Sequence, residues 1–154
     1  MEISRKCETI GPAAEPRNGH RPIVLVDTSI WIEIFRRPAR VRLDRVADFD
    51  DIVTCLPVIQ EVLQGFGDER AFAIARGALN AFPIVESPLT ATAFEEAVRL
   101  YRAARRAGYT VRSGVDCLIA ACALRHGLTV LHHDRDYGVL ARVSALDARE
   151  VRSR

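Results

Sequence analysis

The stretch that decides the fold is IVLVDTSIWIEIF, residues Ile23 to Phe35. Its first four residues are apolar and typical of a buried parallel strand. Asp27 follows at once, and the apolar residues after it recur at the three- and four-residue spacing of a helix. The stretch therefore predicts a buried strand that turns into a helix, with a carboxylate at the junction. In an open parallel sheet, ligands bind outside the carboxyl ends of the strands, so Asp27 is the first candidate site residue.

The alternation of strand and helix continues along the chain. DIVTC (51–55) predicts a strand, and Pro57 suits the first turn of a helix that ends at Gly65. Helices are also predicted over 68–82 and 90–108, and between Ser113 as cap and Gly127 as stop. LTVL predicts a strand, HHDRDYGVLARV a loop with a short helix, and residues 143–146 are a candidate last strand. The pattern predicts a single α/β domain: a central, mainly parallel sheet flanked by helices on both faces.

Composition narrows the class of protein. The 154 residues suit one domain, and 49% apolar with 27% charged residues is typical of a globular chain. No apolar stretch is long enough to cross a bilayer, and the four cysteines have no zinc or C-x-x-C spacing. We therefore expect a reduced, cytoplasmic protein without a membrane partner, with a flexible extension over 1–22, the domain over 23–147 and a tail over 148–154. A net charge of +2 does not by itself indicate a nucleic-acid partner.

Four acids fall at or near strand-to-helix junctions of the predicted sheet. They are Asp27, Glu61, Asp116 and Asp134. Because the carboxyl ends of parallel strands share one edge, the fold would gather these acids into one pocket. Each also has a structural explanation when taken singly. Asp27 suits a helix cap, Asp116 a capping box with Ser113, Glu61 a solvated helix face and Asp134 a turn.

Glu61 is the acid that a purely structural explanation fits least well. It lies within LPVIQEVLQGF, among apolar residues, and a buried lone carboxylate needs a partner or a metal. Clustered carboxylates repel one another, and a hard divalent cation that accepts oxygen ligands relieves that repulsion. The pocket therefore predicts Mg²⁺ as cofactor, with Mn²⁺ as an alternative.

Four segments in series resemble the motifs of PIN-domain ribonucleases, and specifically of VapC-type toxins. They are VDTSIWIE, VIQEVLQG, SGVDCLIAACALRHG and LHHDRDYGVL, and the resemblance covers about Ile23 to Leu146. It implies a central parallel sheet flanked by helices and Mg²⁺-dependent endoribonuclease activity that leaves a 5′ phosphate. It further implies a homodimer that a small antitoxin neutralises by placing its tail in the acidic pocket.

The resemblance also implies roles for individual residues. By position, the catalytic acids of the family fall on Asp27, Glu61, Asp116 and Asp134. Asp27 and Asp116 would be the main direct Mg²⁺ ligands, joined by Asp134, and Thr28 or Ser29 would support the metal or its water. Because HHDRDY contains two aspartates, Asp136 is an alternative to Asp134 as the fourth acid.

Positive charge must surround an acidic pocket that is to receive RNA. Arg112, just ahead of Asp116, is predicted to contact a phosphate. A helical stripe offers further RNA-binding candidates: Arg99, Arg102 and Arg106. The stripe is equally consistent with a solvated helix face. His132 and His133 have no third nitrogen or sulfur ligand at a recognisable spacing, which disfavours a transition-metal site.

Two other functions fit parts of the pattern. A PIN-like module without activity could bind RNA or protein, although the presence of all four acids argues against it. A phosphatase or phosphotransfer domain could use Asp27 as nucleophile. The haloacid dehalogenase pattern requires a second aspartate two residues later, where this chain has Ser29. The sequence thus favours a metal-dependent endoribonuclease that acts as a toxin.

Overall fold

The computed structural model describes residues 21–152, so most of the predicted extension over 1–22 lies outside the described residues. Within them the chain forms a five-stranded sheet of order β3-β2-β1-β4-β5, in which every neighbouring pair is parallel. The strands are β1 (Val24–Val26), β2 (Ile52–Cys55), β3 (Ile84–Val85), β4 (Thr129–His132) and β5 (Asp147–Glu150). The predicted α/β fold with a parallel sheet is confirmed.

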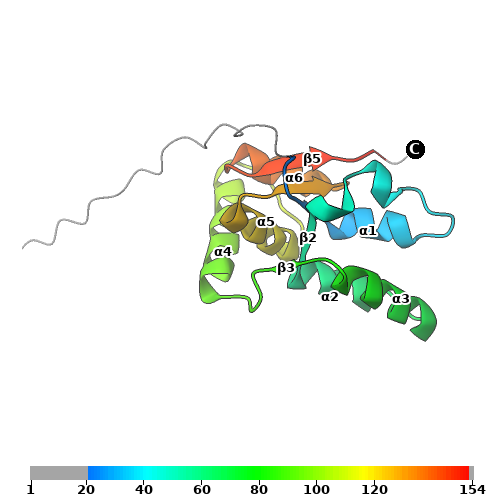
Figure 1. Cartoon of the computed structure of the whole chain (residues 1–154). Helices are drawn as coiled ribbons and strands as arrows, with labels where there is room; N and C mark the ends of the chain where they lie inside the picture. Colours follow the sequence, from blue (N-terminus) through cyan, green and yellow to red (C-terminus); the bar gives the residue numbers. More distant parts are fainter. Residues whose placement is uncertain (1–20, 153–154) are drawn as a thin grey trace, which may run out of the picture.

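Six α-helices connect and cover these strands. They are α1 (Thr28–Phe35), α2 (Leu56–Gln64), α3 (Glu69–Asn80), α4 (Ala91–Arg106), α5 (Gly114–His126) and α6 (Arg135–Arg142). The strand order moves one way from β1 to β3 and the other way from β1 to β5. Because parallel crossovers are right-handed, α1 to α3 cover one face and α4 to α6 the other, as Figure 1 shows for α1 and α5.

The core lies between these layers. All residues of β1 and β4 are buried, as is most of the length of α5. Trp31 of α1 is almost fully buried, and its indole nitrogen donates a hydrogen bond to the Val26 carbonyl oxygen at 3.1 Å. Trp31 therefore belongs to the core, and its indole fixes α1 against the strand that precedes it.

One predicted element is wrong. Residues 143–146 form a turn region rather than a strand, and the edge strand β5 begins at Asp147 and pairs with β4. Residues 148–150, predicted to be part of a tail, consequently belong to the sheet. The reason is that β5, DARE, has only one side paired and is mostly exposed, so its polar sequence lacks the apolar signal of the central strands.

Candidate functional site

The site lies where the strand order reverses, between β1 and β4. Asp27 follows β1 and is the N-cap of α1, while Asp134 follows β4 and is the N-cap of α6. The Asp27 backbone nitrogen donates to the Leu131 carbonyl oxygen at 2.9 Å, which ties the two strand ends together. Glu61 lies in α2, and Asp116 in the first turn of α5. Four different helices therefore present acids toward one edge of the sheet.

Asp27 is held by three donors. Tyr137 donates its hydroxyl to Oδ1 at 2.6 Å, and Ser29 donates its backbone N–H and its hydroxyl to Oδ2 at 2.9 and 2.5 Å. A carboxylate oxygen has two lone pairs. The donors from the described residues thus use both lone pairs of Oδ2 and one of the two on Oδ1. The buried Asp27 carboxylate has a fixed orientation and one remaining position for a further ligand.

Asp116 shows most directly that the acids are close together. Its side chain is buried, and the pKa of this carboxyl is raised to about 8. Burial is the largest cause, and repulsion from the negative charges of the other acids adds to it; in decreasing order they are Asp27, Asp134, Glu61 and Asp136. A carboxyl group with such a pKa lacks a positive partner. Ser113 is the cap that the sequence predicts for α5, because the Asp116 N–H donates to the Ser113 hydroxyl at 3.3 Å.

Glu61 is half-buried and faces the same acids. Thr28 donates its hydroxyl to Glu61 Oε2 at 2.8 Å, so α1 orients a side chain of α2. Burial is the main cause that raises the pKa of Glu61, and the charges of Asp27 and Asp134 raise it further against the opposing effect of the Thr28 hydrogen bond. The prediction that Glu61 is not a solvated surface residue agrees with this environment.

Asp134 and Asp136 differ in how their oxygens are used. Asp134 Oδ1 accepts from the Asp136 N–H at 2.9 Å and from Arg112 Nη2 at 3.0 Å, and no donor among residues 21–152 binds Oδ2. Asp136 is fully buried and accepts the Arg112 backbone N–H at 2.8 Å and its Nε at 3.5 Å. Asp136 thus fixes the segment that carries Arg112, whereas Asp134 keeps one oxygen open.

Tyr137 and the Arg112 ion pairs are the features that the sequence analysis missed. Tyr137 lies three residues after Asp134 on the buried face of α6, and a buried phenol requires a hydrogen-bond partner. The need for a partner could have been inferred from the sequence, but the partner itself, Asp27, lies 110 residues away in the chain. The rings of His132 and Tyr137 pack together with their centroids 5.0 Å apart, and burial lowers the pKa of His132.

The residues present fit a divalent cation. One carboxylate oxygen from each of Asp116, Asp134 and Asp136 lies within 4.8 Å of the others. The donors are oxygens only, and the raised pKa of Asp116 reports charge repulsion that a cation would relieve. Oxygen donors of this kind suit Mg²⁺, Mn²⁺ or Ca²⁺ rather than zinc. The acidic cluster can therefore hold a hard metal ion.

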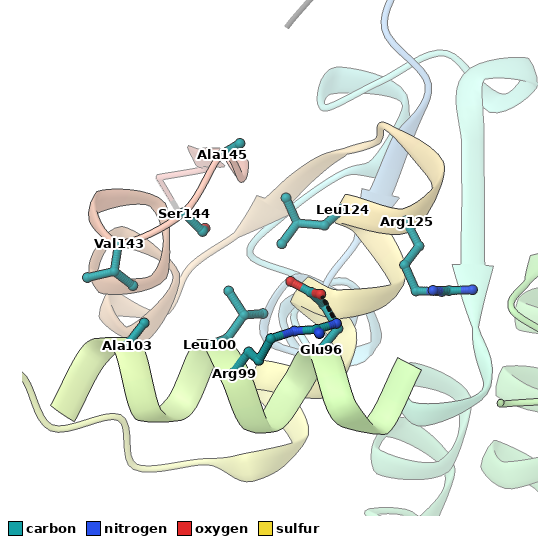
Figure 2. A pocket seen from close by; sticks show the side chains of 9 residues that line it. All are labelled: Glu96, Arg99, Leu100, Ala103, Leu124, Arg125, Val143, Ser144 and Ala145. Atoms are coloured by element: carbon teal, nitrogen blue, oxygen red, sulfur yellow. Dashed lines mark hydrogen bonds and ion pairs between the residues drawn. The ribbon is translucent and has the colours of Figure 1, made fainter. Parts of the chain in front are cut away.

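The arginine stripe of α4 stands apart from this cluster. Arg99 pairs with Glu96 at 2.7 Å and lines a cavity of about 430 Å³ together with Leu124 of α5 (Figure 2). Leu124 is eight residues beyond Asp116, about 12 Å along the helix. Among residues 21–152, neither Arg102 nor Arg106 forms a hydrogen bond or ion pair with an acid of the site. Of the predicted RNA-binding residues, only Arg112 contacts the acids.

Comparison with known proteins shows the family to which this chain belongs. The model of the PIN domain matches residues 24–145, which contain all four acids. The chain belongs to the PIN domain family. It is 40% identical over 135 residues to ribonuclease VapC11 of Mycobacterium tuberculosis, spanning 84% of this chain and all of the relative. It is 30% identical to ribonuclease VapC51 of the same species, spanning 78% of this chain and 86% of the relative. The resemblance to VapC ribonucleases is therefore confirmed.

Solved structures share the fold of this PIN domain. DNA-bound VapBC of Salmonella typhimurium superimposes with a TM-score of 0.67 at 18% identity, over 84% of this chain and 98% of the other. VapBC-5 of Mycobacterium tuberculosis, a toxin–antitoxin system, gives 0.59 at 22% identity, over 85% and 99%. Within residues 21–152, no helix has the length and apolar character needed to span a membrane.

Proposed function

We propose that this PIN domain is a divalent-metal-dependent endoribonuclease, with Mg²⁺ as its metal, and that it is the toxin of a toxin–antitoxin pair. The observation that carries the proposal is the position of Asp116. Burial is the main cause that raises its pKa to about 8, and the negative charges of Asp27, Asp134, Glu61 and Asp136 add to it. Among residues 21–152, the arginines near the cluster pair with Asp134 and Asp136, and none pairs with Asp116. Such a cluster destabilises the metal-free fold and suits a reaction that needs a cation. The 40% identity to a VapC ribonuclease supports RNA as the substrate.

The metal would be held by Asp27, Asp116 and Asp134. Asp27 offers the free lone pair of Oδ1, and Asp134 offers Oδ2. When bound, Mg²⁺ would lower the pKa of a water and offset negative charge that develops on the scissile phosphate. Ser29 would act by orienting Asp27. Asp136 would hold the Arg112 segment, and because one of its oxygens also lies in the acidic cluster, it is the alternative to Asp134 as the fourth acid.

Glu61 is proposed as the group that accepts a proton from the attacking water. Its pKa is raised by burial, and a carboxylate with a raised pKa is a stronger base at neutral pH. The hydrogen bond from Thr28 to Oε2 directs the side chain and leaves Oε1 without a donor from the described residues. Thr28 is therefore a positioning residue for the base.

Arg112 is proposed to contact the RNA backbone beside the acids. Its side chain is half-exposed, and its guanidinium binds Asp134 with one nitrogen and Asp136 with another. A guanidinium has five N–H donors, so donors remain for a phosphate oxygen. Arg112 would reduce the repulsion between the acidic pocket and the substrate.

An RNA degradation assay tests the proposal. The full chain should fragment RNA with Mg²⁺, stop when EDTA is added, and leave 5′ phosphates on the products. Asp27→Asn, Asp116→Asn and Asp134→Asn should each lower the rate at least 100-fold while keeping the circular dichroism spectrum. Asp50→Asn, which changes an exposed acid outside the site, serves as matched control. Cleavage by Asp116→Asn at the parent rate would show that the acids are not the catalytic centre.

The biological role is proposed from the relatives. The superimposed structures include complexes named as toxin–antitoxin systems, and an antitoxin is therefore the proposed protein partner, with a homodimer as the proposed assembly. Induced expression should stop bacterial growth, and Asp116→Asn should not. Growth arrest that persists in the variant would separate toxicity from the acidic site.

A further inference from the structure

A second polar cavity lies at the carboxyl end of α4. It has a volume of about 330 Å³ and is lined by Tyr101, Arg105, Gly108, Tyr109 and Thr110. This volume is at the lower end of the range for small-ligand pockets. The cavity does not include any of the acids described above, so it is separate from the proposed metal site.

The cavity owes its shape to the end of α4. Gly108 has φ +83°, a left-handed conformation that a side chain disfavours, and the chain turns back so that the Tyr109 N–H donates to the Ala104 carbonyl oxygen at 2.9 Å. This turn places Tyr109 on the same cavity as Tyr101, which lies one turn before the Arg105 position on α4. Both tyrosines are half-buried and line the cavity, which therefore has two aromatic side chains in its wall.

Arginines accompany both tyrosines. The Arg105 guanidinium lies 5.9 Å from the Tyr101 ring centroid, and that of Arg142 lies 5.9 Å from the Tyr109 ring centroid. Arg142 also donates to the Tyr109 hydroxyl at 3.4 Å. In the part of the chain that the structure describes, neither arginine forms an ion pair with a carboxylate. Their charges are available to a negatively charged ligand.

The chain itself connects this cavity to the proposed catalytic site. Thr110 lines the cavity, and Arg112, two residues later, donates its backbone N–H to Asp136 at 2.8 Å. Two residues span at most about 7 Å even when fully extended. The Thr110 side of the cavity therefore lies within about 7 Å of Arg112, the residue that contacts Asp134 and Asp136.

We propose that this cavity is a nucleobase subsite, which holds the base of a nucleotide adjacent to the scissile phosphate in single-stranded RNA. The inference rests on the proposed ribonuclease function. Proteins bind single strands by combining a basic groove along the backbone with aromatic side chains on which bases stack. Tyr101 and Tyr109 supply aromatic surface, and the unpaired arginines supply the positive charge. The 430 Å³ cavity of Figure 2 has no aromatic lining residue and pairs Arg99 with Glu96, so it lacks this combination.

Binding of short RNA to the full chain tests the subsite. Every protein carries Asp116→Asn so that the probe is not cut, and the probes are fluorescein-labelled eight-nucleotide RNAs of one base each and an abasic ribose-phosphate strand of the same length. Tyr109→Leu should bind the best base-bearing RNA at least about 5-fold more weakly, the lower limit for the loss of one stacked base. Its affinity for the abasic strand should remain within twofold of the parent.

Two variants control for the fold and for the hydroxyl group. Tyr109→Phe keeps the ring and should bind RNA like the parent. Phe94→Leu removes an exposed aromatic of α4 outside the cavity and should also bind like the parent. Unchanged affinity of Tyr109→Leu for base-bearing RNA, or an equal loss for the abasic strand, would overturn the subsite.

Failure of the subsite and failure of the ribonuclease proposal give different results. If the chain with intact Asp116 degrades RNA while Tyr109→Leu has no effect on binding, the subsite alone is wrong. If the chain with intact Asp116 neither cuts RNA nor binds it, the ribonuclease function is wrong and the subsite falls with it.

Discussion

Tyr137 holds Asp27 from another element of the fold. The phenol is fully buried and donates to a buried carboxylate at 2.6 Å. Tyr137→Phe removes the donor and should lower the free energy of unfolding by about 1.5–3 kcal/mol, the range for hydrogen bonds to charged groups. Urea denaturation measures the change. Tyr101→Phe is the matched control and should change stability by less than about 0.5 kcal/mol; equal stability of both variants would contradict the role of Tyr137.

Asp116 should give the metal-free protein a distinctive pH dependence. Its pKa is raised in the folded chain from 3.8 to about 8, so the fold favours the protonated form. The stabilising contribution is present below about pH 4 and is lost as the pH rises toward 8. In EDTA, the parent should therefore lose more stability than Asp116→Asn between pH 5 and pH 8. Parallel thermal-unfolding profiles of the two proteins across this range would contradict the raised pKa of Asp116, which burial and the neighbouring acids cause.

At the scale of elements, the stability of the protein depends on the residue that caps the carboxyl end of α5. Gly127 caps its carboxyl end with φ +62°, a conformation that costs other residues roughly 1–2 kcal/mol. Gly127→Ala should destabilise the protein by that amount. Gly77→Ala is the matched control because Gly77 lies inside α3 with open space around its Cα. Gly77→Ala should stabilise the protein by about 0.5–1 kcal/mol. Similar unfolding free energies for the Gly127→Ala and Gly77→Ala variants would contradict this role of the cap.

The elements also show why sequence reasoning succeeded where it did. The junctions that carry Asp27, Asp116 and Asp134 could be predicted because local signals mark them: a buried apolar run, a hydroxyl cap and a helix start. The polar edge strand β5 could not, because its place in the sheet depends on β4 rather than on its own composition.

The contacts of the site that could not be predicted from the sequence are those between distant elements. The hydrogen bond of Tyr137 to Asp27 and that of Arg112 to Asp136 join residues 110 and 24 positions apart. No local pattern encodes such pairs, because they result from the packing of α6 against β1 and α5. Our proposal of Asp134 over Asp136 therefore rests on contacts that only the structure shows, in which Arg112 and the Asp136 N–H both bind Oδ1 of Asp134.

At the scale of the whole molecule, the fold brings mutually repelling acids together, and a bound cation should offset the repulsion between their negative charges. A ligand that binds only the folded state stabilises it by about 2.7 kcal/mol at a concentration 100 times its dissociation constant. Saturating Mg²⁺ should thus raise the unfolding temperature of the parent at pH 8, and less so at pH 5, where Asp116 is protonated. A Mg²⁺ effect that is the same at both pH values would indicate binding elsewhere.

Isothermal titration of the metal-free full chain with Mn²⁺ at pH 8 is the most direct measurement of the central claim, that the gathered acids form one divalent-metal site. The parent and Asp50→Asn should show saturable binding with the same affinity, and Asp116→Asn should bind at least 10-fold more weakly. Absence of saturable binding by the parent, or equal binding by Asp116→Asn, would contradict the account.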